Sequence, residues 1–230
     1  MNNKNISIGI VSYHRPESLN ITLANLIGIA NGMTIYLALG ALTDVYKNNP
    51  YFEQIVGAYK QMGGKIIILN NKKIKLECGR KLLIETAKEE GIDWLIMSDD
   101  DFLIDNKLLK KTIKYINEIE GLNGFMPIHP NGYPIRETTL NYTDDYIKCA
   151  ISFSKFTEYL GGWYAINLDN KFNFKFNLKQ NEPGEDRMIF KDIPNKYIFT
   201  ELNAYHMTSK ELGSHYDYKK YFGEENKYWK

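Results

Sequence analysis

Apolar residues in the first 128 positions follow two alternating patterns, and the alternation predicts strands joined by helices. Five short runs have the length and apolar character of strands: Ile6–Tyr13, Thr34–Leu39, Lys65–Leu69, Trp94–Met97 and Phe125–Ile128. Between them, apolar side chains recur at helical spacing in 16–31, 51–62, 78–90 and a stretch that Asp105 or Asn106 can cap. Strands that alternate with helices predict an α/β fold with a mixed, mainly parallel sheet flanked by helices.

The pattern changes after about residue 129, where turn residues become frequent. Three further strands are expected at Tyr146–Phe153, Tyr164–Leu168 and Tyr197–His206, with antiparallel pairing as one arrangement. We find no repeat and no linker, so residues 1–230 are expected to form a single domain. The tail, 208–230, either lies over a face of the domain or is mobile.

One uncharged run, Ile21–Leu42, is long enough to cross a bilayer. Asn31-Gly32 interrupts it, and the spacing of apolar residues changes there from helical to strand-like. A helix, a turn and a buried strand therefore explain the run, and no membrane span is expected.

Composition narrows the function classes. The 230 residues are 43% hydrophobic with a net charge of +1, which excludes a nucleic-acid binder identified by charge alone. Only four of the 29 basic residues are arginines, and Asn is frequent, which is typical of AT-rich coding and hints at a phage or a low-GC host.

Two cysteines make neither a disulfide scaffold nor a zinc motif. Because no apolar signal core opens the sequence, we expect a cytoplasmic protein, in the host cytoplasm if phage-encoded.

Asp99-Asp100-Asp101 follows the fourth predicted strand, at the sheet edge where α/β proteins bind ligands. If strand geometry persists, Asp99 and Asp101 point to one side and Asp100 points to the other. Two carboxylates on one side favour a hard cation between them, Mg²⁺ or Mn²⁺. The alternative is a polar turn leading into the next helix.

Three other positions carry candidate chemistry. Glu185 and Asp186 precede an apolar run, and one of them can act as a general base or merely complement a helix dipole. His206 ends the last predicted strand, where it is a metal ligand or a structural residue. His14 follows the first strand, on the same sheet edge as the acidic triplet.

In this order, the motifs resemble those of GT-A glycosyltransferases, most closely of the family 2 type. The similar segments are Ile8–Pro16 (opening strand and nucleotide loop), Cys78–Leu82 (helix start), Trp94–Asp101 (strand and D-x-D motif), Leu160–Ala165 (Gly-Gly-aromatic) and Gly184-Glu185-Asp186 (Glu-Asp motif). The resemblance covers about residues 6–207. It implies a GT-A-like nucleotide-diphospho-sugar transferase fold, with a nucleotide-binding half at about 1–128 and an acceptor half at about 129–207.

The resemblance implies a metal-dependent transferase that moves a sugar from a nucleotide-diphosphate sugar, with a UDP-sugar favoured, to an acceptor hydroxyl. Asp186 would be the base of an inverting reaction and Glu185 would orient the acceptor or the base. The implied metal ligands for Mn²⁺ or Mg²⁺ are Asp99, Asp101 and His206. The implied donor-binding residues are Tyr13, His14, Arg15, Asp44, Arg80, Asp99 and Asp100, and the implied acceptor residues are Gly162 and Trp163. Asp44 matches the family pattern only loosely, and Lys81 stands where Asn is common.

Two other function classes fit the residues. A nucleotidyltransferase also uses a metal at such a sheet edge, although the segment 12–16 lacks its usual Gly-rich basic loop. A non-catalytic nucleotide-sugar or glycan-binding module would not need both Asp101 and Asp186.

The acceptor also has two interpretations. A hydroxymethylated base of phage DNA could meet the basic residues Lys72, Lys73, Lys75, Arg80 and Lys81, or these could form a solvated loop face.

Overall fold

The fold is taken from a computed structural model of the chain. The structure describes residues 4–12, 15–40, 46, 48–71, 76–128, 150–152, 162–169, 171, 172, 174, 176, 189 and 193–207.

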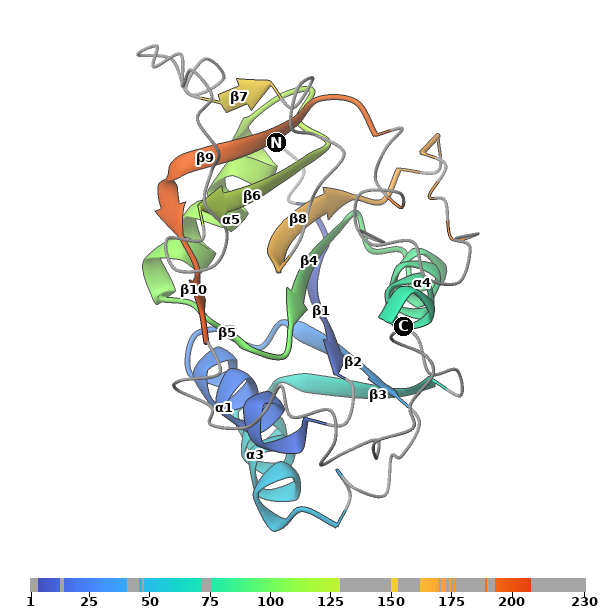
Figure 1. The fold of residues 1–230 in the computed structure, drawn as a ribbon, viewed down its shortest axis with the longest axis vertical. Helices are drawn as coiled ribbons and strands as arrows, with labels where there is room; N and C mark the ends of the chain where they lie inside the picture. Colours follow the sequence, from blue (N-terminus) through green and yellow to red (C-terminus); the bar gives the residue numbers. More distant parts are fainter. Residues whose placement is uncertain are drawn as a thin grey trace, which may run out of the picture.

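A twisted mixed sheet forms the centre of the molecule (Figure 1). Its strands are β1 (Ile6–Ser12), β2 (Thr34–Gly40), β3 (Lys65–Asn71), β4 (Trp94–Asp99), β6 (Gly124–Ile128), β7 (Ala150–Ser152), β8 (Trp163–Asn167) and β9 (Lys196–Asn203), in the order β3-β2-β1-β4-β8-β6-β9-β7. The first four strands are mutually parallel. The sheet is therefore mixed and mainly parallel, as the sequence predicted.

Helices cover both faces of this sheet. The described helices are α1 (Pro16–Ile27), α3 (Pro50–Gln61), α4 (Leu76–Glu89) and α5 (Asn106–Glu118). Residues from α1, α3 and α5 share one apolar core with Ile8 and Ile10 of β1. Residues from α4 share the other core with Val11. The strands are apolar on both faces because each face is covered, and Figure 1 shows α4 across the sheet from the other helices.

Local signals explain where several elements begin and end. Asp105 caps α5 by accepting a hydrogen bond from the backbone N–H of Leu108, as predicted. Helix α1 ends at Ile27, earlier than the predicted residue 31. Asn31 and Gly32 then adopt positive φ angles of 47° and 80°, which turn the chain into β2. The uncharged run is thus a helix, a turn and a strand, and no described helix is long and apolar enough to cross a membrane.

The second half completes the sheet by inserting strands out of sequence order. Strand β8 lies antiparallel between β4 and β6, and β7 is antiparallel to β9. Strand β9 is parallel to β6, which differs from the antiparallel arrangement considered for this half. Separately, β10 (Tyr205–His206) pairs with β5 (Phe102–Leu103) in a two-stranded ribbon. The predicted strand over 146–153 corresponds in the described residues to β7.

The turn between α3 and β3 gives a test of the packing. A methyl group on Gly64 would overlap the ring of Tyr59, which is buried and held by a 2.6 Å hydrogen bond from its hydroxyl to the carbonyl of Met33. We predict that Gly64→Ala lowers the free energy of unfolding by about 1–3 kcal/mol. The matched control is Gly57→Ala within α3, where a methyl group meets nothing within 4 Å. It should raise stability by about 1 kcal/mol, and urea denaturation that ranked the two variants the other way would contradict this packing.

Candidate functional site

The acidic triplet forms a tight turn at the carboxyl end of β4, and the second half of the chain holds its backbone. Strand β4 ends at Asp99, and Asp100 and Asp101 form the turn. The N–H of Asp99 donates to the carbonyl of Gly162 at 2.9 Å. The N–H of Met207 donates to the carbonyl of Asp101 at 2.8 Å. Residues distant in sequence therefore fix both ends of the turn.

Two arginines bind the three carboxylates of this turn. Arg80 of α4 donates from Nη2 to Oδ1 of Asp99 at 2.9 Å. Arg15, at the start of α1, contacts Asp101 Oδ2 through Nη1 at 2.9 Å and Asp100 Oδ1 through Nη2. Asp100 and Asp101 thus share a partner, unlike the expectation that Asp99 and Asp101 point together. That expectation required strand geometry, and the strand ends at Asp99.

A chain of hydrogen bonds joins Asp100 to the end of β1. Ser12 Oγ donates to Asp100 Oδ2 at 2.5 Å and lies 2.9 Å from the Tyr46 hydroxyl. Because Ser12 has one hydroxyl proton, Tyr46 is the donor in their contact. The Tyr46 oxygen in turn accepts the backbone N–H of Arg15 at 3.2 Å. Thr22 of α1 donates to the carbonyl of Asp100 at 2.8 Å. Asp100 therefore anchors the segment that carries Arg15.

Burial dominates the electrostatics of this network. Asp100 is fully buried, and removal from water raises the pKa of its carboxyl to about 7, while the Arg15 guanidinium acts in the opposite direction. Burial also raises the pKa of Tyr46, so its hydroxyl stays protonated and available as a donor. Of the three carboxyl groups in the triplet, that of Asp100 therefore costs the most free energy to keep ionised.

The predicted site residues other than Trp163 divide into three groups. The described structure brings together Arg15, Arg80, Asp99, Asp100, Asp101 and Gly162 around the turn. Five others lie outside the described residues: Tyr13, His14, Asp44, Glu185 and Asp186. For His206 the backbone is described, and it pairs with Phe102, next to Asp101. This backbone position suits the expectation that His206 and Asp101 act at one place.

Trp163, an implied acceptor residue, lies in the core. Its side chain is 1% exposed and belongs to the core shared with α1, α3 and α5. A buried indole has no face open for stacking on an acceptor ring.

Sequence reasoning missed Ser12, Thr22 and Tyr46 as parts of this network. Ser12 had a signal, since it ends the first strand at the same sheet edge as the triplet. Thr22 looks like any polar residue in an amphipathic helix. Tyr46 had no signal, because its contact with Ser12 depends on chain segments that only the tertiary structure brings together.

The chemistry of the turn suits a hard divalent cation, but its described arrangement is held by arginines. Asp99 and Asp101 supply carboxylate oxygens, which Mg²⁺ and Mn²⁺ prefer. Within the part of the chain that the structure describes, no three His, Cys, Asp or Glu side chains form a metal-binding group. Both carboxylates contact a guanidinium instead. The residues thus fit the cation by donor type, while each of the two carboxylates also contacts an arginine.

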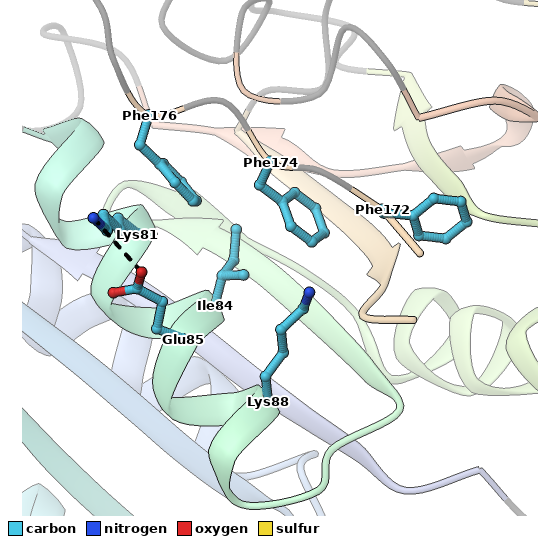
Figure 2. A pocket seen from close by; sticks show the side chains of 7 residues that line it. All are labelled: Lys81, Ile84, Glu85, Lys88, Phe172, Phe174 and Phe176. Carbon is cyan, nitrogen blue, oxygen red and sulfur yellow. Dashed lines mark ion pairs between the residues drawn. The ribbon is translucent and has the colours of Figure 1, made fainter. Parts of the chain in front are cut away.

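A separate cavity of about 440 Å³ lies against α4 (Figure 2). Its lining residues are Lys81, Ile84, Glu85, Lys88, Phe172, Phe174 and Phe176. The ammonium of Lys88 lies 4.9 Å from the centre of the Phe174 ring, and burial lowers the pKa of Lys88. None of the acidic-turn residues lines this cavity, which lies between α4 and the side chains of Phe172, Phe174 and Phe176.

Comparisons with known proteins find similarity in structure alone. No protein-family model and no curated protein sequence matches the chain. Among solved structures, S. aureus TarS 1–349 superposes with a TM-score of 0.62 at 15% identity, over 90% of this chain and 62% of that one. The mannosyltransferase PcManGT from Pyrobaculum calidifontis, in complex with GDP-Man and Mn²⁺, gives 0.61 at 11% identity, over 90% and 57%. A 4-diphosphocytidyl-2C-methyl-D-erythritol synthase from Anaerococcus prevotii gives 0.52 at 14% identity, over 88% of each chain.

These similarities confirm the GT-A-like fold class. At such low identity they establish the fold and not the activity. The chain spans about three fifths of the length of the first two of these structures.

The buried carboxyl of Asp100 generates a pH prediction. Its pKa is about 7 in the folded protein and near 4 in the unfolded chain, so between these values the folded state binds the extra proton. Its contribution to stability is therefore full below pH 4 and is lost as the pH rises toward 7, by up to about 1.4 kcal/mol per pH unit.

The measurement is urea denaturation of the wild type and of Asp100→Asn from pH 4 to pH 7, without divalent metal. The amide of the variant does not titrate. The stability difference between the two proteins should shift steadily with pH, in favour of the variant at the higher values. Parallel stability curves would contradict the raised pKa of Asp100.

Proposed function

We propose that the protein is a metal-dependent glycosyltransferase that moves a sugar from a nucleotide-diphosphate sugar to an acceptor hydroxyl. The observation that carries the proposal is the acidic turn at the carboxyl end of β4, held from β8 and β10 at the centre of a GT-A-like sheet. A structural neighbour with this fold is a mannosyltransferase that binds GDP-Man and Mn²⁺.

The turn has the charges that such a reaction requires. Transfer leaves a nucleoside diphosphate, whose negative charge must be balanced as the sugar departs. Asp99 and Asp101 would hold Mn²⁺ or Mg²⁺ together with His206, whose backbone pairs with Phe102, the residue after Asp101. When bound there, the cation would act as a Lewis acid toward the phosphate oxygens. Arg15 contacts Asp101 and Arg80 contacts Asp99, and each guanidinium can bind a phosphate in a bidentate manner.

The remaining roles are proposed from the sequence motifs. Asp186 would accept the proton of the acceptor hydroxyl in an inverting transfer, and Glu185 would orient the acceptor or the base. Tyr13, His14 and Asp44 would contact the donor, for which a UDP-sugar is favoured. Asp100, because it is fully buried, would contribute by holding Arg15. Gly162 would contribute through its backbone beside Asp99.

The acceptor is proposed only as a class. A hydroxymethylated base of phage DNA agrees with the Lys-rich composition. DNA binding of this kind would weaken steeply with salt, because phosphate contacts release counterions.

A nucleotidyltransferase is the second candidate, and one observation favours it. The synthase of a diphosphocytidyl product shares the fold at a TM-score of 0.52, over 88% of both chains. A binding module without turnover is the third candidate, and it would bind the same donors.

A donor screen separates these functions. Thermal unfolding would be followed with a panel of nucleotide sugars and a panel of nucleoside triphosphates, each with and without Mn²⁺. We predict that a nucleotide sugar raises the melting temperature only when Mn²⁺ is present. The variants Asp101→Ala and Asp101→Asn should lose this shift and at least about 100-fold in turnover, as expected when charge stabilisation in the transition state is removed. Metal-dependent stabilisation by triphosphates alone would favour the nucleotidyltransferase, and full turnover in both variants would exclude Asp101 as a metal ligand.

The base assignment has its own test. We predict that Asp186→Asn lowers transfer by about 100-fold or more, because the amide cannot accept the proton of the acceptor. Donor affinity, measured by calorimetry, should stay within about twofold of the wild type. Asp169→Asn is the matched control, since Asp169 is an exposed aspartate whose carboxylate pairs with Lys171. Unchanged transfer in Asp186→Asn would move the base to another residue, and NMR of the product anomer would show whether the reaction inverts.

A further inference from the structure

The guanidinium of Arg15 lies where it balances the negative charge of the acidic turn. One guanidinium contacts both Asp100 and Asp101. The two carboxylate side chains are 0% and 4% exposed, whereas that of Arg15 is 19% exposed. The arginine is therefore the most exposed of these three side chains.

Arg15 and a divalent cation cannot bind Asp101 independently. The guanidinium approaches Oδ2 of Asp101 to 2.9 Å, so a cation coordinated by the same carboxylate would lie beside an existing positive charge. Two positive charges that share one carboxylate repel each other, and a site that is largely removed from water screens this repulsion only weakly. Arg15 therefore opposes binding of the cation while it keeps its contact with Asp101.

Separate hydrogen bonds hold the backbones of Arg15 and Asp101. The backbone of Arg15 is held by Tyr46, so the segment stays in place while the side chain changes. Asp101 is held independently, through its carbonyl and the N–H of Met207. Rotation of the long Arg15 side chain away from the turn would break its ion pairs with Asp100 and Asp101.

We propose that Arg15 is an internal counterion that competes with the divalent cation for Asp101. Release of Arg15 from Asp101 and binding of the cation to Asp101 are then a single coupled equilibrium. This inference rests on the proposed function, since it concerns the cation of that site. Without the cation, Arg15 keeps the adjacent carboxylates from repelling each other. With a donor bound, the diphosphate offers the released guanidinium a new bidentate partner, which couples donor binding to cation binding.

The test is a titration with MnCl₂ in the absence of nucleotide, followed by the electron paramagnetic resonance signal of free Mn²⁺. The apparent Kd of the wild type for Mn²⁺ equals the intrinsic Kd divided by the fraction of molecules in which Arg15 does not contact Asp101. If Arg15 contacts Asp101 in about nine molecules of ten, Arg15→Gln should bind Mn²⁺ about tenfold more tightly. Arg15→Lys, which keeps the charge and loses the two-pronged contact, should fall between the two.

The matched control is Lys114→Gln. It removes the same charge from a half-exposed position on α5, where Lys114 pairs only at the surface with Glu118. Its Mn²⁺ affinity should equal that of the wild type. Equal affinities in the wild type and Arg15→Gln, weaker binding in Arg15→Gln, or no Mn²⁺ binding in any of the proteins would each overturn the proposal.

A second measurement covers the case in which Arg15→Gln does not fold. The chain contains four arginines, so their side-chain Nε–H signals can be resolved by NMR of protein labelled with ¹⁵N-arginine. Arg15→Lys identifies the Arg15 signal by its loss. In the wild type, titration with diamagnetic Mg²⁺ should shift this signal toward that of a solvated guanidinium. Mg²⁺ binding seen by calorimetry with an unchanged Arg15 signal would overturn the proposal.

These outcomes are separable from those of the proposed function. A protein that binds nucleotide sugars with Mn²⁺ but shows no effect of Arg15→Gln would retain the function and lose the competition. A protein that shows tighter Mn²⁺ binding in Arg15→Gln but no response to any nucleotide sugar would retain the competition and lose the function.

Discussion

The carboxyl of Asp100 is buried completely, and the arrangement of the site follows from how the fold compensates for that. Ser12 donates to it from the end of β1, and the guanidinium of Arg15 lies against it from the start of α1. Tyr46 closes the same network by contacting both Ser12 and the backbone of Arg15. A buried charge without such partners would destabilise the fold, so the segments that carry the candidate chemistry are bound to one another through this one group.

The sheet places that group at the junction between the two halves of the chain. Strands β1 to β4 are parallel, so their carboxyl ends share one edge, where both Ser12 and Asp99 lie. Strand β8 then packs antiparallel on β4, and Gly162 just before it fixes Asp99. Strand β10 fixes the far end of the turn through the neighbouring Met207. Hydrogen bonds thus hold the backbone of the acidic turn at both ends. What can change is the group that each carboxylate contacts.

Local patterns were sufficient to predict the first half of the fold. The apolar runs, the cap at Asp105 and the Asn31-Gly32 turn depend on neighbours within a few residues, and the structure confirms them. The direction of β9 and the order of β6, β8 and β9 depend on pairing between distant segments, which periodicity does not encode. The predicted orientation of the triplet depended on strand geometry persisting through Asp101, and that condition is not met because the strand ends at Asp99.

The amino-acid sequence by itself determined that the chain forms an α/β sheet and that an acidic triplet stands at the carboxyl end of a parallel strand. Both follow from hydrophobic periodicity and strand order, which are local properties. Only the tertiary structure decided which arginine contacts which carboxylate, that Asp100 is buried and that Trp163 belongs to the core. Those outcomes depend on side chains from separate elements meeting in space, and on how much water the packed halves exclude from each charge.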